Sequence, residues 1–134
     1  MSDWNTGIIE EFRAKGGEVA GFEGKPLLLL HHRGARTGAE RVNPLMYQRV
    51  GDSYAVFASK GGADTNPDWF HNLKANPDAT IEVDGAKLDV RARIAEGGEQ
   101  TEIWEQQKRE FPQFADYEKK TSRGRIPVIV LDPT

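Results

Sequence analysis

The sequence predicts a mainly β domain with inserted helices, in which about six strands close into a small barrel. Short apolar or alternating segments are separated by two-residue glycine turns, Gly51-Asp52 and Asp84-Gly85, which are typical of hairpins between antiparallel neighbours. Closing such a sheet into a barrel removes its exposed edges. No G-x-G-x-x-G segment follows a strand and opens a helix, so a Rossmann-type nucleotide site is not supported. At 134 residues the chain is expected to form one domain, residues 1–134.

Periodicity and turn signals place the elements along the chain. We expect, in order, a helix at about 5–15, strands at 25–32, 41–50 and 53–59, a helix at 66–75, strands at 79–83 and 87–94, helices at 97–110 and from there to about 120, and a strand at 125–131.

Local signals justify the first of these elements. The first helix carries Ile8, Ile9 and Phe12 on one face and is expected to cover the barrel. The first strand is apolar throughout residues 27–30, as expected where both faces of a sheet are buried. A glycine-containing turn at 33–39 then leads into the 41–59 hairpin.

The second half is justified in the same way. Asn66 is expected to cap the next helix, with Pro67 at its first position and Asp68 in its first turn. The sequence Asn76-Pro77 ends that helix, because the residue before a proline avoids helical geometry. Trp104 in the following helix is expected to be part of the core.

Composition excludes several classes of function. The chain has no cysteine, so disulfides, thiolate catalysis and iron–sulfur sites are excluded. Its net charge of −3 makes nucleic acid a poor candidate for a partner. No apolar run approaches the roughly 20 residues that span a bilayer. The first residues do not resemble a signal peptide. We therefore expect a cytoplasmic protein with at most peripheral membrane contact.

The region from residue 33 to residue 60 is basic within this acidic chain. It holds five cations and two anions: Arg33, Arg36, Arg41, Arg49 and Lys60, against Glu40 and Asp52. Two donor-rich turns, residues 34–38 and 58–62, lie within it, and the second leads to a helix start. Glycine turns, cations and a helix start together favour a phosphate-bearing ligand. A solvated strand surface is the alternative explanation of the charges.

The same region resembles a known family. The segments GARTGAERVNPLMY (34–47) and FASKGGADTNPDWFHNLKANP (57–77), and more loosely RIPVIVLDP (125–133), are similar to the deazaflavin-dependent nitroreductase and quinone reductase family, which uses coenzyme F420. The resemblance implies a split β-barrel of the FMN-binding type. It also implies hydride transfer from the reduced deazaflavin to a quinone-like, nitroaromatic or other electron-poor small molecule. No side-chain nucleophile is expected, because the cofactor carries the chemistry.

The resemblance also assigns residues to the site. Those expected to contact the cofactor are Ala35, Arg36, Thr37, Arg41, Val42, Asn43, Pro44, Leu45, Met46, Phe57, Ala58, Ser59, Lys60, Gly61, Asp68, Trp69, Phe70, His71 and Asn72. Those expected to form the acceptor pocket are Met46, Phe111, Phe114 and Tyr117. Relatives that activate nitroimidazoles carry tyrosines around this pocket. Phenylalanine stacks but donates no hydrogen bond, so a quinone is favoured over a nitroimidazole.

Several alternatives remain open. An FMN-dependent enzyme or a non-catalytic F420-binding carrier could use the same barrel, and either a monomer or a homodimer fits the sequence. No metal site is expected, because His31 and His32 are adjacent on a strand and face opposite sides. Trp69 and Lys60 are interpreted as pocket residues, with a core position and a solvated loop as the respective alternatives.

Overall fold

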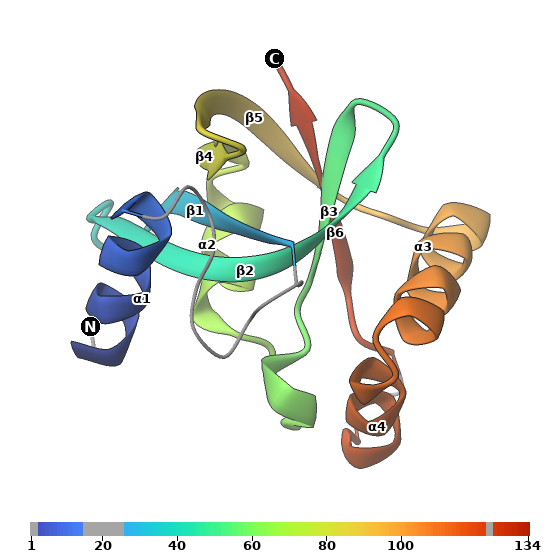
Figure 1. Ribbon diagram of the computed structural model, residues 1–134. Helices are drawn as coiled ribbons and strands as arrows, with labels where there is room; N and C mark the ends of the chain where they lie inside the picture. The colour runs from blue at the N-terminus through green and yellow to red at the C-terminus, as the bar shows by residue number, and fades with distance from the viewer. Residues whose placement is uncertain (1–2, 15–25, 123–124) are drawn as a thin grey trace.

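The structure is a computed structural model that describes residues 3–14, 26–122 and 125–134 (Figure 1). In chain order the elements are α1 (Asp3–Ala14), β1 (Leu27–Arg33), β2 (Glu40–Val50), β3 (Ser53–Phe57), the 3₁₀ turn η1 (Lys60–Gly62), α2 (Asp68–Ala75), β4 (Asp78–Val83), β5 (Ala86–Ile94), α3 (Gly97–Glu110), α4 (Gln113–Lys120) and β6 (Val128–Pro133).

The described strands form a closed antiparallel barrel in the order β1-β2-β3-β6-β5-β4, and β4 pairs with β1. The 11-residue strand β2 serves two neighbours. Its first part pairs with β1 as far as Leu27↔Met46, and its second part pairs with β3 from Tyr47↔Val56 onward. The barrel expected from the sequence is therefore confirmed.

Both hairpins expected from glycine turns are present. The β4–β5 turn places Asp84 at φ 51° and Gly85 at φ 76°, so both central residues are left-handed, as a type I′ turn requires. Gly51, at φ 60°, joins β2 to β3. These turns match the right-handed twist of their strands and fix the registers Val83↔Ala86 and Val50↔Ser53.

The core has an interior and two outer patches. Inside the barrel, leucines of β1 and residues of the five remaining strands pack with Trp69, Phe70 and Leu73 of α2. On the outside, α1 lies against β1 and β2 and buries Ile8, Ile9 and Phe12, whereas α3 and α4 cover β3 and β6 (Figure 1). The expectations that the first helix covers the barrel and that Trp104 is core are confirmed. Within the described residues no helix is long and apolar enough to cross a membrane.

Some boundaries differ from the expectations. Asn66 is not the cap of α2: the helix begins at Asp68, and Pro67 occupies the N-cap position with an extended ψ of 158°. The Pro67 carbonyl accepts the first bond, from the Phe70 N–H at 3.1 Å. β6 begins at Val128 rather than at Arg125, after Pro127, which has no N–H to donate to a sheet. The expected first-helix end at 15 and first-strand start at 25 lie outside the described residues.

Candidate functional site

Two clefts adjoin where β2, the turn after β1 and the N-terminus of α2 meet. The larger, which we call the β2 cleft, has a volume of about 530 Å³. It is lined by His32, Ala39, Glu40, Arg41, Val42, Asn43, Lys60, Pro67, Asp68 and Trp69.

The second cavity, the turn cleft, has a volume of about 390 Å³. It is lined by Gly34, Ala35, Arg36, Thr37, Arg41, Asp68, His71 and Asn72. Arg41 and Asp68 line both clefts, so one elongated ligand could occupy the two together.

The turn at residues 34–39 owes its shape to its glycines. The Gly34 N–H donates to the Ala39 carbonyl and the Gly38 N–H to the Gly34 carbonyl, each at 2.9 Å, and Gly38 adopts φ 72°. A side chain at Gly34 would place its Cβ 3.0 Å from Thr37 Oγ1 and 3.6 Å from Arg41 Nε. Gly34 thus leaves room for the Thr37 hydroxyl inside the turn. Gly34 was expected in the turn but not among the cofactor contacts.

Lys60 is held in an uncommon backbone conformation on the wall of the β2 cleft. Its φ of 48° lies in the left-handed region, which non-glycine residues adopt rarely and mostly where the surroundings impose it. Its Nζ lies 3.3 Å from Thr65 Oγ1. The turn that it opens is closed by bonds from the Gly62 N–H to Ser59 and from the Ala63 N–H to the Lys60 carbonyl. The ammonium group is therefore placed by a defined turn.

The two clefts are lined by both cationic and anionic side chains. Arg36, Arg41 and Lys60 supply the cations. Asp68 is the first residue of α2, where the helix dipole favours a carboxylate. Glu40, the first residue of β2, also lines the β2 cleft, and its Oε1 lies 3.3 Å from His31 Nδ1. Anionic groups of a ligand are thus directed to the guanidinium and ammonium groups.

His32 is a site residue that sequence reasoning did not include. It is only 3% exposed and bonds Asn43 Oδ1 through Nε2 at 2.7 Å and Asn72 Nδ2 through Nδ1 at 3.1 Å. Asn72 Oδ1 in turn accepts the Ala35 N–H at 2.9 Å. Burial, above all, lowers the pKa of His32 from its ordinary 6.5. No local pattern reveals this role, because Asn72 is 40 residues away along the chain.

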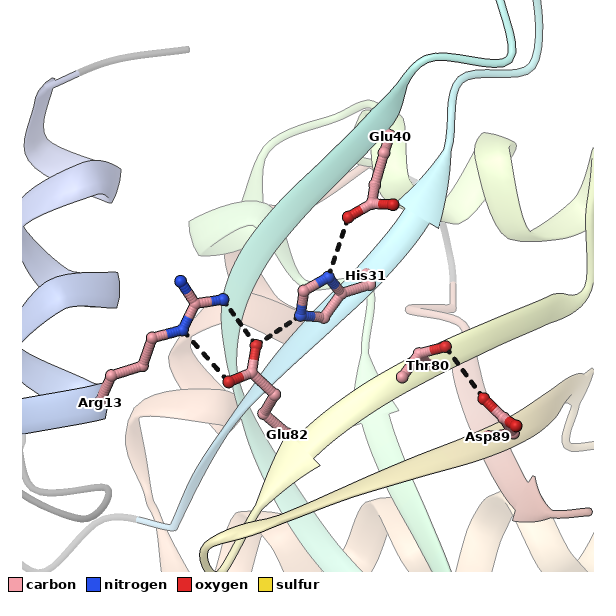
Figure 2. Close-up of polar contacts among 6 residues, drawn as sticks. All are labelled: Arg13, His31, Glu40, Thr80, Glu82 and Asp89. Carbon is pink, nitrogen blue, oxygen red and sulfur yellow. Dashed lines mark hydrogen bonds and ion pairs between the residues drawn. The ribbon is translucent and has the colours of Figure 1, made fainter.

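His31 faces the other way, as expected for adjacent strand residues. Figure 2 shows its ring between Glu40 of β2 and Glu82 of β4, with Arg13 of α1 on the same Glu82 carboxylate. The His31 Nε2 to Glu82 Oε2 distance is 2.5 Å. His31 therefore belongs to the contact between α1 and the barrel, outside both clefts.

The structure places the expected cofactor contacts in two groups. Those that line the clefts are Ala35, Arg36, Thr37, Arg41, Val42, Asn43, Lys60, Asp68, Trp69, His71 and Asn72. Those outside the clefts are Pro44, Leu45, Met46, Phe57, Ala58, Ser59 and Phe70. The structure describes Gly61 only as part of the backbone of η1. Phe57 and Phe70 are buried in the core, because the strand pleat and the helix face turn them there. Trp69 is both core and cleft wall, so its two interpretations hold together.

The residues expected to form the acceptor pocket gather in one aromatic cluster. Phe114 is buried, with its ring centroid 5.5 Å from that of Phe57 and 5.2 Å from that of Tyr117. Met46 and Phe111 are partly buried against the same cluster. Met46 also contacts the cluster under α1, so it lies between the N-terminal helix and the C-terminal pair.

Comparison with known proteins shows which family the chain belongs to. The model of the F420H(2)-dependent quinone reductase family matches residues 6–133. An F420H(2)-dependent quinone reductase of Mycobacterium tuberculosis is 40% identical over 109 residues, which cover 79% of this chain and 72% of the relative.

Solved structures agree. An F420-H2 dependent reductase is 37% identical and superposes with a TM-score of 0.73, covering 80% of this chain and 94% of its own. A protein solved as a domain-swapped dimer is 34% identical with a TM-score of 0.75, covering 97% of this chain and 98% of its own. The split-barrel expectation is confirmed by these neighbours, and the chain belongs to the F420H(2)-dependent quinone reductase family.

Proposed function

We propose that the protein transfers a hydride from reduced coenzyme F420 to a quinone-like or other electron-poor acceptor. The observation that carries the proposal is the pair of adjoining clefts, lined by Arg36, Arg41 and Lys60, in a chain of this family. When bound, the reduced deazaflavin supplies the hydride. The chain's own residues bind the cofactor, orient it and exclude water around it.

The residues present fit such a cofactor. F420 carries a phosphate and several glutamyl carboxylates, which suit the forked donors of Arg36 and Arg41 better than a single phosphate would require. Lys60 supplies a point charge on the wall of the β2 cleft. Trp69, 5% exposed, gives the same cleft a flat apolar surface for a ring system. FMN, which ends at one phosphate, leaves more of these cations without a partner.

The acceptor is proposed to be flat and apolar and to contact the aromatic cluster. Because Phe114 is buried, the partly buried members Met46, Phe111 and Tyr117 are the ones that can meet an acceptor. Of these, only the Tyr117 side chain carries a hydrogen-bond donor. Since phenylalanine can stack but cannot donate a hydrogen bond, a flat apolar quinone is the favoured acceptor.

Removing a cleft cation tests the proposal. We expect Lys60→Ala and Arg41→Ala each to weaken F420 binding about tenfold, because each removes a charge-assisted contact to an anionic group. Fluorescence titration with F420 measures the change. Lys87→Ala is the charge-matched control, since Lys87 lies at the start of β5 outside both clefts. Unchanged affinity in both cleft variants would contradict the site.

Assembly and location are proposals of the same kind. A relative of 34% identity was solved as a domain-swapped dimer, and this supports a homodimer. We place the protein in the cytoplasm with at most peripheral membrane contact. Light scattering of the purified chain at two concentrations decides between monomer and homodimer. Co-sedimentation with neutral and with anionic vesicles checks for peripheral contact.

A further inference from the structure

A hydrogen-bonded chain of three side chains runs along the walls of both clefts and joins four parts of the fold. Asn43 belongs to β2, His32 to β1 and Asn72 to α2, and the chain ends on the Ala35 N–H of the turn after β1. His32 and Asn72 are 3% and 7% exposed, so water competes little for these bonds.

The direction of every bond in this chain follows from its last member. A backbone N–H can only donate, so Asn72 Oδ1 must accept from Ala35 and Asn72 Nδ2 must donate to His32 Nδ1. Nδ1 therefore carries the lone pair and Nε2 the proton. The Nε2 proton is donated to Asn43 Oδ1, which leaves the amide nitrogen of Asn43 as its remaining donor group.

We infer that neutral His32, with its proton on Nε2, is a positioning residue that fixes the orientation of the Asn43 and Asn72 side-chain amides. Through these amides it also fixes the position of the two cleft walls formed by β2 and by the turn after β1. Asn43 then offers an N–H, rather than its carbonyl, to an oxygen acceptor of the bound ligand in the β2 cleft. Asn72 holds the turn that carries Arg36 and Thr37. This inference rests on the proposed function only for the identity of that ligand.

Protonation of His32 would break the chain. A proton on Nδ1 would face the amide hydrogens of Asn72, so Asn72 could keep its bond to the ring only by turning its oxygen away from Ala35. The charged groups around the ring are Arg41 of β2 and His31 of β1, which disfavour the cation, and Asp68 of α2, which favours it. Cofactor affinity is therefore expected to hold at pH 6.5 and to fall only as the pH drops through the lowered pKa of His32.

The first test uses ligand-free protein and no activity. Long-range ¹H–¹⁵N correlation of the imidazole at pH 7.5 is expected to show His32 with its proton on Nε2. Amide exchange is expected to be slow at Ala35, with Gly34 and Gly38 as references, because both are bonded within the turn. A proton on Nδ1, or a charged ring at this pH, overturns the inference.

The second test uses substitutions. His32→Phe keeps a ring but no nitrogen. We expect amide exchange at Ala35 to rise about tenfold more than at Gly34 and Gly38, and the Kd for F420 to rise about tenfold.

Two further variants keep this test decisive. His31→Phe, on the same strand but facing outward, is the matched control and is expected to bind F420 as the wild type does. His32→Gln retains one donor and one acceptor and is expected to recover part of the lost affinity. Equal F420 affinity in His32→Phe and wild type overturns the inference. If the wild type itself does not bind F420, the proposed function fails, and the ligand-free measurements still decide the role of His32.

Discussion

At the scale of single residues, the Glu82 carboxylate joins three elements. It accepts from Arg13 of α1 through Nε at 3.1 Å and Nη2 at 2.7 Å, and it contacts His31 of β1 (Figure 2). Arg13 is the main reason that the pKa of Glu82 falls from 4.5 to about 2. The carboxylate is partly exposed, so solvent weakens these contacts.

Glu82→Gln tests these contacts between α1, β1 and β4. We expect it to lower the free energy of unfolding at pH 7 by about 1 kcal/mol, because the charged hydrogen bonds to Arg13 are lost. Since the folded pKa is depressed, the contribution of Glu82 is complete above pH 4.5 and is lost as the pH falls toward 2. Urea unfolding at pH 7 and pH 3 should therefore show the two proteins converging at low pH.

A constant gap between Glu82→Gln and wild type at both pH values would contradict this role. Asp78→Asn serves as the control, because its ion pair with Arg91 is largely exposed, at 78% and 61% of the two side chains, and should contribute little.

Gln107 is a residue with an unmet donor. It is fully buried, and its Oε1 accepts from Gln48 Nε2 at 3.2 Å, but its Nε2 has no hydrogen-bond partner within the described residues. Gln48 also donates to the Ile103 carbonyl at 3.1 Å, so it keeps one acceptor without Gln107. The buried, unpaired N–H of Gln107 lowers the stability of the fold.

Gln107→Met should therefore raise the free energy of unfolding by about 1 kcal/mol, because it removes a desolvated donor and fills the same space with an apolar chain. Urea unfolding measures it. A loss of stability of that size would show that the Gln48–Gln107 bond outweighs the unpaired donor.

At the scale of elements, η1 depends on its contact with α4. Gly62 adopts φ 85°, and a Cβ there would lie 3.1 Å from the Tyr117 backbone and from Lys120 Cβ. The segment is held further by Thr121 Oγ1, which donates to the Ala63 carbonyl at 2.8 Å. This packing is what fixes Lys60 on the wall of the β2 cleft.

Gly62→Ala is therefore expected to cost more stability than Gly51→Ala. Both residues have positive φ, so each substitution costs about 1 kcal/mol of backbone strain. Only at Gly62 does a side chain also collide with a neighbouring helix, which adds about 1 kcal/mol or more. Urea unfolding of the pair gives the difference. Equal losses in the free energy of unfolding would mean that α4 shifts to accommodate the side chain and does not stabilise the turn.

The elements themselves were largely predictable, because their signals are local. Asp84-Gly85 predicted its hairpin since two left-handed residues are needed there, and residues 27–30 predicted a strand buried on both faces. The start of α2 was misplaced, because Pro67 accepts the first helical bond and takes the cap position itself. Apart from the two hairpins, the strand partners could not be derived, since no local signal marks the change of neighbour between Met46 and Tyr47.

The site was predictable to the same local extent. The turn at 34–38 and Lys60 were proposed from glycines and cations that are close in sequence, and they line the two clefts. Phe57 and Phe70 were expected at the cofactor; the structure places both in the core, a direction set by the pleat and by packing that no local signal gives. His32 was missed because its partners come from β2 and α2.

At the scale of the whole molecule, the helix-covered parts of the barrel are separate from the two clefts. α1 and the α3–α4 pair cover the outside of two pairs of strands, and α2 packs against the interior (Figure 1). The two clefts lie where α2 meets the turn after β1 and the start of β2. Strands and α2 thus carry the hydrogen-bonded side chains His32, Asn43 and Asn72, and the cations come from the turn (Arg36), from β2 (Arg41) and from η1 (Lys60).

The most direct test of the central claim is a titration of the purified protein with F420 and, separately, with FMN. We expect F420 to bind at least about tenfold more tightly than FMN, because only its acidic tail engages Arg36 and Arg41 together. Arg36→Ala should reduce that preference. Equal binding of both, a preference for FMN, or no binding of F420 would contradict the assignment of the clefts to this cofactor.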